Sequence, residues 1–124
     1  MNLIEQANKA KLNSYSPYSN FKVGAALLTK SGKVYTGCNI ENTSYSPSCC
    51  AERVAFYKAI SEGEKEFEAI AITGTNNPCY PCGVCRQVIK EFCSDDFKIY
   101  LLDNENVVSY TLKEILPYSF KLER

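Results

Sequence analysis

Two cysteine-bearing segments, Cys50-Ala51-Glu52-Arg53 and Pro81-Cys82-Gly83-Val84-Cys85, constrain the fold more than any other feature of this 124-residue chain. Cys82 and Cys85 are three positions apart, so a first helical turn places both sulfurs on one side of a helix. Cys50 can supply a third sulfur if the fold brings its distant segment to the same place. Zinc accepts thiolates in tetrahedral geometry, and a catalytic zinc keeps three protein ligands and one open position. The spacing therefore predicts a zinc site with these three cysteines as ligands, which is catalytic if the fourth position stays open and structural if a fourth cysteine closes it.

Glu52 lies two residues beyond Cys50, close enough to act on a metal-bound water without being a ligand. The chain has no histidine, so acid–base chemistry must come from a carboxylate, a thiol, Lys, Tyr or a metal-bound water. We therefore expect Glu52 to move the protons. An acidic residue is also favourable in the first turn of any helix because of the helix dipole, so a purely structural role stays open.

The charge of such a site needs a nearby cation. All three cysteines would lie at helix N-termini, where free N–H groups stabilise thiolates. Three thiolates leave the zinc centre with a net negative charge, which weakens it as a Lewis acid. Arg53 is the first candidate to offset that charge, and Arg86, beside Cys85, is the second.

A closed four-cysteine zinc site that only holds the fold together is the main structural alternative. Cys79, Cys49 or Cys38 could supply its fourth ligand, and Cys79-Tyr80-Pro81-Cys82 is itself a C-x-x-C sequence. A redox role for Cys82 and Cys85 would leave Cys50 and Glu52 unexplained. The positions of Glu52 and Pro81 favour catalysis.

The composition limits the classes of partner. Lys+Arg and Asp+Glu number 14 each, so no basic surplus for binding nucleic-acid phosphates is expected. The first residues are too polar for a secretory signal, and no apolar run approaches transmembrane length. Seven cysteines without such a signal indicate the reducing cytoplasm. We expect one cytoplasmic domain over residues 1–124, with small ligands and neither nucleic acid nor a membrane as partner.

The hydrophobic pattern predicts helices and strands in a mixed α/β order. Helices are predicted from Leu3 to before Ser16-Pro17, and at Ala51–Glu62, Cys82–Cys93 and Leu112–Leu116. Strands are predicted at Phe21–Thr29, Val34–Ile40, Ala69–Thr73, Lys98–Leu102 and Val107–Thr111. The two central helices should bury one face each, made of Val54, Ala55, Ala59 and Ile60 in the first and of Val84, Val88, Ile89 and Phe92 in the second.

Two features of topology follow from these elements. The third strand, the third helix and the fourth strand form a βαβ unit, so these two strands should be parallel with a right-handed crossover. Only a short turn separates the last two strands, which should therefore be antiparallel. The predicted fold is a three-layer αβα arrangement, in which a five-stranded mixed sheet carries helices on both faces.

With the zinc motifs in place, nearly the whole chain resembles a cytidine deaminase of the small homotetrameric type. The zinc motifs alone mark the deaminase superfamily, and the Asn-Ile-Glu-Asn stretch is more specific. The matching segments are Tyr15-Ser16-Pro17-Tyr18-Ser19, Phe21-Lys22-Val23-Gly24-Ala25-Ala26, Gly37-Cys38-Asn39-Ile40-Glu41-Asn42, Cys50-Ala51-Glu52-Arg53 and Pro81-Cys82-Gly83-Val84-Cys85-Arg86-Gln87.

The resemblance implies deamination of cytidine and 2′-deoxycytidine to uridine and 2′-deoxyuridine with release of ammonia, as in pyrimidine salvage. It implies one zinc ion per subunit, with Glu52 as the proton shuttle and three ligands, Cys50, Cys82 and Cys85. It implies four further roles: Asn39 and Glu41 bind the ribose 3′-hydroxyl, Phe21 packs against the base, Arg53 donates to the ligand thiolates, and Phe120 reaches into a neighbouring subunit's pocket of a homotetramer.

Two other functions stay open from the sequence. A deaminase of another small substrate, such as a nucleoside antibiotic, would use the same zinc chemistry. A non-enzymatic zinc module would have four protein ligands. Without the resemblance, Asn39 and Glu41 read as ordinary turn residues, and Phe21 and Phe120 as core residues.

Overall fold

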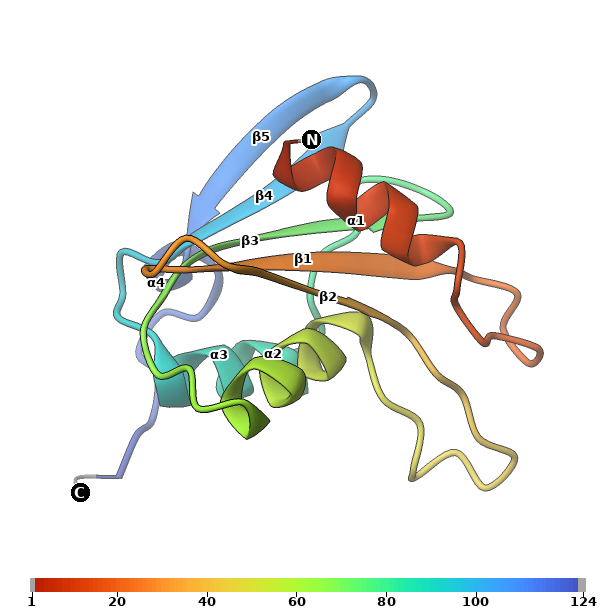
Figure 1. Ribbon diagram of the computed structural model, residues 1–124, viewed down its shortest axis with the longest axis horizontal. Coiled ribbons are helices and arrows are strands. Elements are labelled where there is room, and N and C mark those ends of the chain that lie inside the picture. Colours follow the sequence, from red (N-terminus) through yellow and green to blue (C-terminus); the bar gives the residue numbers. More distant parts are fainter. Residues whose placement is uncertain (1, 123–124) are drawn as a thin grey trace.

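A five-stranded sheet with helices on both faces forms the body of the protein (Figure 1). The computed structural model describes residues 2–122. Its helices are α1 (Leu3–Lys11), α2 (Ala51–Ser61), α3 (Gly83–Phe92) and α4 (Leu112–Ile115). Its strands are β1 (Val23–Thr29), β2 (Val34–Cys38), β3 (Phe67–Gly74), β4 (Lys98–Asp103) and β5 (Asn106–Thr111). This is the fold class predicted from the sequence.

The sheet has the strand order β2-β1-β3-β4-β5. Strands β1 and β2 form an antiparallel hairpin, and β1 also pairs antiparallel with β3. Strand β3 pairs parallel with β4, and β4 pairs antiparallel with β5, so both topological predictions are confirmed. Strand β3 therefore lies at the centre of the sheet, and its end leads through a loop to the start of α3.

Helix α1 covers one face of the sheet, and helices α2 and α3 cover the other (Figure 1). Two glycines allow this close approach. A Cβ built at Gly24 would lie 2.0 Å from the carbonyl oxygen of Ala7 in α1. A Cβ built at Gly37 would lie 2.5 Å from the carbonyl oxygen of Ala51 in α2. Both layers are thus in backbone contact with the sheet.

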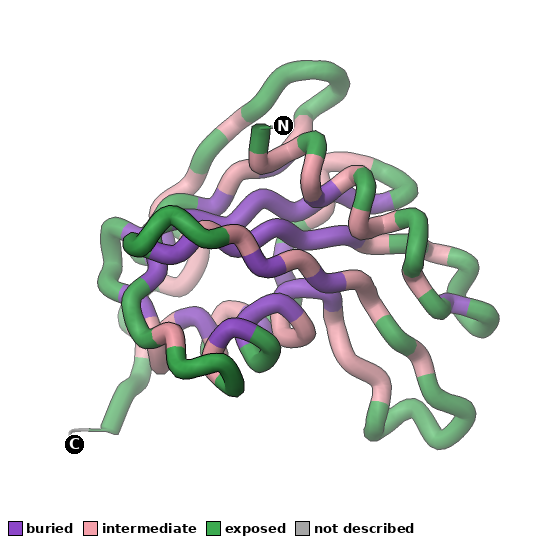
Figure 2. The backbone as a smooth tube through the Cα atoms, viewed as in Figure 1, coloured by how far each residue is buried: buried purple, intermediate pink, exposed green. Residues whose placement is uncertain are grey.

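The main core lies between the sheet and helices α2 and α3. Figure 2 shows buried backbone along the central strands and on α2. Phe56 is fully buried, and its ring contacts the rings of three other aromatic residues, Phe67, Phe92 and Phe97. The sequence analysis did not place Phe56 on the buried face of its helix. This core fixes the starts of α2 and α3 relative to each other.

Two sequence predictions are corrected by the structure. Val84 was expected in the core but is 58% exposed, so helical periodicity identified an apolar face without showing what covers it. The first strand was expected to begin at Phe21 but begins at Val23. The reason is that side chains bond the backbone there: Asn39 donates to the Phe21 carbonyl oxygen and accepts from the Val23 N–H, and Ser19 accepts from the Phe21 N–H. No helix among residues 2–122 is long and apolar enough to cross a membrane.

Candidate metal centre

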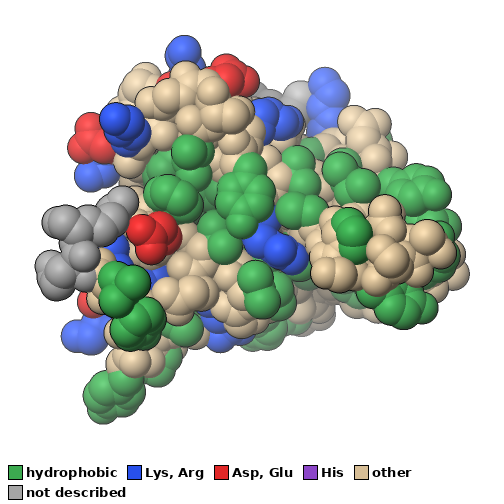
Figure 3. Space-filling view, turned by 90° about the horizontal axis from the view of Figure 1, so that it is seen from below, with side chains coloured by type: hydrophobic (Ala, Val, Ile, Leu, Met, Phe, Trp, Pro, Cys, Tyr) green, Lys and Arg blue, Asp and Glu red, His purple; other side chains and the backbone are tan. Residues whose placement is uncertain are grey.

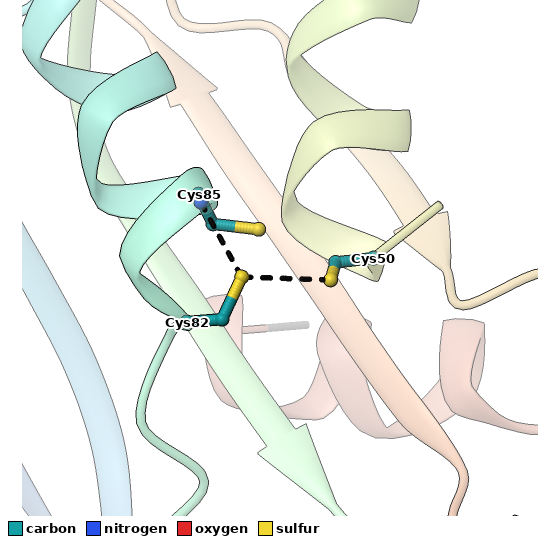
Figure 4. A group of neighbouring side chains, drawn as sticks. All are labelled: Cys50, Cys82 and Cys85. Carbon is teal, nitrogen blue, oxygen red and sulfur yellow. Dashed lines mark hydrogen bonds between the residues drawn. The ribbon is translucent and has the colours of Figure 1, made fainter. Parts of the chain in front are cut away.

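Cys50, Cys82 and Cys85 lie together where helices α2 and α3 begin (Figure 4). Their three sulfur atoms are all within 4.8 Å of one another, and the sulfurs of Cys50 and Cys82 are 3.8 Å apart. Cys50 is the N-cap residue of α2 and Cys82 that of α3. Cys85 follows in the first turn of α3, and its backbone N–H donates to the sulfur of Cys82 at 3.4 Å. The predicted convergence of the two segments is confirmed.

The three sulfurs fit a zinc ion. Zinc–sulfur bonds are about 2.3 Å long, and two thiolates on one tetrahedral ion are therefore about 3.8 Å apart. The Cys50–Cys82 separation is 3.8 Å. Among residues 2–122, no fourth Cys, His, Asp or Glu joins this cluster. The donor set is thus the three-ligand type, which leaves one coordination position for water or substrate.

None of the other cysteines joins the three. Cys38, Cys49, Cys79 and Cys93 are free thiols outside the group. Burial raises the pKa of the Cys79 thiol to about 11, so this thiol is neutral near pH 7. The closed four-cysteine arrangement considered from the sequence is therefore absent from the described part of the chain.

Arg53 lies against the cluster, as the sequence analysis predicted. Its Nη2 donates to the sulfur of Cys50 at 3.3 Å. Hydrogen bonds from Cys85 and then from Arg53 lower the pKa of the Cys50 thiol to about 5, although burial opposes this. The same hydrogen bond to Cys50 raises the pKa of the Cys85 thiol. A cation among the three sulfurs would favour the thiolate form of each.

Arg86, the second candidate for charge compensation, has a different role. Its Nε donates to the carbonyl oxygen of Pro81, and its Nη1 donates to that of Ile115, both at 2.7 Å. The guanidinium therefore ties the residue before Cys82 to the end of α4. Arg53 is the arginine with a hydrogen bond to a cluster sulfur.

Glu52 is buried beside the sulfurs, with only 4% of its surface exposed. Burial raises the pKa of its carboxyl to about 7, its own backbone N–H lowers it, and the neighbouring Cys50 raises it. The nearby Cys85 side chain lowers the same pKa, and the low exposure of Glu52 separates its carboxyl from bulk water. A bound cation would lower this pKa. The geometry gives Glu52 the position that a proton-transfer group at the metal needs.

A cavity of about 450 Å³ opens beside Cys50 and Arg53. Asn39 and Glu41, predicted from the resemblance, both line it, together with Tyr45, Ser46, Ser48, Cys49, Cys50, Arg53 and Val84. Both side chains are held by the segment before β1. Ser14 donates to the side-chain amide oxygen of Asn39 at 2.5 Å, and Ser19 donates to the Glu41 carboxylate. Nothing in the sequence singled out Ser14, because this contact exists only once the two loops have folded together.

The two predicted aromatic contacts lie in different places. The ring of Phe21 packs against Gly74. A Cβ built on Gly74 would lie 3.0 Å from the Phe21 ring and 3.0 Å from the Cys79 sulfur. Phe120 is 68% exposed, and its carbonyl oxygen accepts a hydrogen bond from Gln87 on α3 at 2.8 Å. The aromatic tail thus runs along the outside of α3.

Comparison with known proteins agrees with this site. Residues 1–101 match the family model described as the cytidine and deoxycytidylate deaminase zinc-binding region. The chain belongs to this family. The matched region contains all three cysteines of the cluster, so zinc is the metal that the site is built to hold.

Individual members of the family resemble the chain over almost its whole length. It is 47% identical to a cytidine deaminase of Sporosarcina psychrophila over 123 residues, which cover 98% of this chain and 90% of the relative. It is similar to the crystal structure of a cytidine deaminase from Burkholderia pseudomallei, with a TM-score of 0.90 and 45% identity over 95% and 96% of the two chains. A blasticidin-S deaminase of Bacillus cereus is 28% identical over 97% of this chain and 91% of its own.

Proposed function

We propose that this protein deaminates cytidine and 2′-deoxycytidine hydrolytically to the corresponding uridines, with release of ammonia. The observation that carries the proposal is the buried carboxyl of Glu52 beside three sulfurs that leave one metal position open. The high identity to cytidine deaminases over nearly the whole chain supports the same reaction.

When bound, a zinc ion supplies a Lewis acid with an open position and lowers the pKa of water held there. Glu52 accepts a proton from the attacking water and delivers it to N3 of the base as C4 is attacked. It then moves the proton of the new C4 hydroxyl to the amino group, so that the C4–N bond breaks, the C4 carbonyl forms and ammonia leaves. Arg53 stabilises the Cys50 thiolate throughout, because its guanidinium donates to that sulfur. General acid–base catalysis of this kind contributes about 10²–10⁴-fold.

The charges around the cavity favour a nucleoside over a nucleotide. The one cation among the described residues that line it, Arg53, already donates to Cys50. Glu41 lines the same cavity, and hydrogen bonds from Ser19 keep the pKa of its carboxyl low. A phosphate group would meet this carboxylate, while the guanidinium of Arg53 is engaged at the Cys50 sulfur. We therefore propose that Asn39 and Glu41 bind the sugar of a neutral nucleoside, its 3′-hydroxyl, and that Phe21 packs against the base.

We also propose that the protein works as a homo-oligomer, a tetramer, in the cytoplasm. Hydrophobic side chains gather on the face of the molecule that carries α2 and α3 (Figure 3). Tyr57 and Val84 are 48% and 58% exposed there, around a hollow that Gln87, Val88, Glu91 and Phe92 also line. Apolar surface of this kind is typical of subunit interfaces. Seven free thiols support a reducing compartment.

An ultraviolet assay of the purified protein tests the function directly. Cytidine and 2′-deoxycytidine should lose the absorbance of the amino-pyrimidine, whereas adenosine and guanine should not react. Removal of zinc with a chelator should abolish turnover, and restored zinc should recover it. Turnover of a nucleoside antibiotic such as blasticidin S, with none of cytidine, would support the alternative deaminase. A zinc-loaded protein with four protein ligands by X-ray absorption and no turnover would support the structural module.

Glu52→Gln tests the proton transfer. The variant keeps the size and hydrogen-bonding reach of the side chain but cannot carry protons, so kcat should fall by about 10²–10⁴-fold. Its zinc content, measured by elemental analysis, should stay at that of the unmodified protein because Glu52 is not a ligand. Glu68→Gln, an exposed position on β3, serves as the control and should leave kcat unchanged. Full turnover in Glu52→Gln would remove Glu52 from the mechanism.

A further inference from the structure

The amide of Asn39 is built into the chain in one orientation. Its carbonyl oxygen accepts from the backbone N–H of Val23 at 2.9 Å, and its Nδ2 donates to the carbonyl oxygen of Phe21 at 2.8 Å. A flipped amide would place donor against donor and acceptor against acceptor at these two contacts. Because both backbone groups demand the same orientation, the oxygen and the nitrogen of this side chain are assigned by their partners.

Ser14 fills the remaining acceptor site of the same oxygen. Its hydroxyl donates to the Asn39 carbonyl oxygen at 2.5 Å, and the Ser14 side chain is half-buried between two loops. An amide oxygen has two lone pairs, and Val23 and Ser14 use both of them. The amide nitrogen has two hydrogens, of which Phe21 takes one. Asn39 can therefore offer a ligand in the cavity a single N–H and no acceptor.

Glu41, which lines the same cavity, has the opposite character. One oxygen of its carboxylate accepts from the backbone N–H groups of Tyr18 and Ser19 at 3.0 and 3.1 Å, and the other accepts from the Ser19 hydroxyl. An ionised carboxylate only accepts hydrogen bonds. A group that faces both side chains must therefore accept from Asn39 and donate to Glu41, which a hydroxyl does and a carbonyl, carboxylate or ammonium does not.

We propose that Ser14 is a positioning residue that makes Asn39 a pure donor and thereby sets the specificity of this subsite for a sugar hydroxyl. The proposal rests on the deaminase function above. Without the Ser14 hydroxyl, one lone pair of the Asn39 oxygen loses its partner and the amide loses one of its three restraints. The free N–H is then held less firmly toward the ligand, while the cysteine cluster and Glu52 are untouched.

The test compares Ser14→Ala with the unmodified protein on three nucleosides. Cytidine and 2′-deoxycytidine carry the 3′-hydroxyl, and 3′-deoxycytidine lacks it. Ser14→Ala should raise KM for the first two by about three- to tenfold, the size of one hydrogen bond, and leave kcat within about twofold. KM for 3′-deoxycytidine should not change, because this analogue makes no use of the Asn39 N–H.

Two further variants serve as controls. Ser14→Thr keeps the hydroxyl and should restore the KM for cytidine. Ser61→Ala removes a hydroxyl that donates to Lys58 on α2, away from the cavity, and should have no effect on any of the three substrates.

The outcomes separate the two proposals. An equal rise of KM for all three nucleosides, or no rise for any, would overturn the role of Ser14. An unmodified protein that deaminates none of them would contradict the deaminase function, and calorimetric titration with uridine and 3′-deoxyuridine would then decide the role of Ser14 from binding alone.

Discussion

At the scale of single residues, the start of helix α2 combines a metal-binding thiol, an acid and a cation within four positions. Cys50 belongs to the three-cysteine cluster, Glu52 is buried beside it, and Arg53 donates to the Cys50 sulfur at 3.3 Å. Three thiolates bring more negative charge than a zinc ion neutralises, so the guanidinium carries part of the compensation. Side chains that hydrogen-bond metal ligands in this way tune both affinity and activity.

Arg53→Ala should weaken zinc retention and turnover. The variant removes the donor to the Cys50 sulfur, and loss of such a partner costs about 10–100-fold in metal affinity or activity. Competition with a chromogenic chelator measures the affinity, and the ultraviolet assay measures the turnover. Arg53→Lys keeps the charge without the planar guanidinium. Its zinc affinity and turnover should lie between those of the unmodified protein and those of Arg53→Ala. Zinc affinity and kcat both unchanged in Arg53→Ala would assign the arginine a role in packing only.

The spacing of residues predicted this part of the site well. The three cysteines and Glu52 are read from short local motifs that helix geometry brings to one side. Ser14 was not predictable, because its contact with Asn39 joins positions 25 residues apart through two irregular loops. Arg86 lies beside a ligand in the sequence, yet its hydrogen bonds go to the backbone carbonyls of Pro81 and Ile115, and the second of these depends on the position of α4.

At the scale of elements, the site depends on how closely α2 lies on the sheet. Gly37 in β2 faces the first turns of α2, where a Cβ would come within 2.5 Å of the Ala51 carbonyl oxygen and 2.7 Å of the Ala55 backbone nitrogen. Both neighbours are backbone atoms and cannot move independently of the helix. Any side chain at position 37 must therefore push away the helix that carries Cys50 and Glu52.

Gly37→Ala should lower the free energy of unfolding by about 1–3 kcal/mol, the usual cost of overpacking. The displaced helix should also separate Cys50 from Cys82 and reduce zinc content. Gly83→Ala in α3 is the matched control: beyond its chain neighbours and its own helix backbone, no atom of the described residues lies within 4 Å of a Cβ built there, and alanine favours a helix. Urea unfolding of the two variants measures the difference. Equal stabilities would show that α2 accommodates the methyl group without strain.

Helices and strands were predicted to within a few residues, and the exceptions have physical causes. Strand β1 begins two residues late because side chains, and not a neighbouring strand, bond the backbone of Phe21: its carbonyl oxygen accepts from Asn39 and its N–H donates to Ser19. Val84 lies on the apolar face of α3 that the helical period predicts, but it is exposed. Periodicity identifies an apolar face and does not show which part of the molecule covers it. The parallel β3–β4 pair and the antiparallel β4–β5 pair were predictable from connection lengths alone.

At the scale of the whole molecule, one chain leaves its apolar face and its aromatic tail exposed to water. The exposed Val84 lines both the cavity beside the metal cluster and the hollow on the α2–α3 face, so the two surfaces are continuous. Phe120 lies on the outside of α3, anchored through its carbonyl oxygen by Gln87. A second subunit on this face would cover the hollow and could receive the Phe120 ring near its own cavity. This arrangement motivates the oligomer proposal.

Phe120→Ala should raise KM for cytidine by about tenfold, the scale of one lost aromatic contact, with a smaller effect on kcat. Its folding should be disturbed less than KM, since the ring is 68% exposed within its own chain and no core of that chain depends on it. Leu122→Ala, 71% exposed on the same tail, is the matched control and should leave KM unchanged. Sedimentation should give a tetramer for all three proteins, and a fully active monomer would contradict the proposal.

Mixed oligomers then decide whose cavity the ring enters. Subunits with Glu52→Gln turn over little substrate but present an intact Phe120 to their neighbours. If the ring acts between subunits, co-assembly with an excess of Glu52→Gln subunits should return the KM of Phe120→Ala subunits toward that of the unmodified protein. If the ring acts within its own chain, the active subunits keep the raised KM whatever their neighbours carry. The single measured quantity, KM in the mixture, thus separates a shared site from a self-contained one.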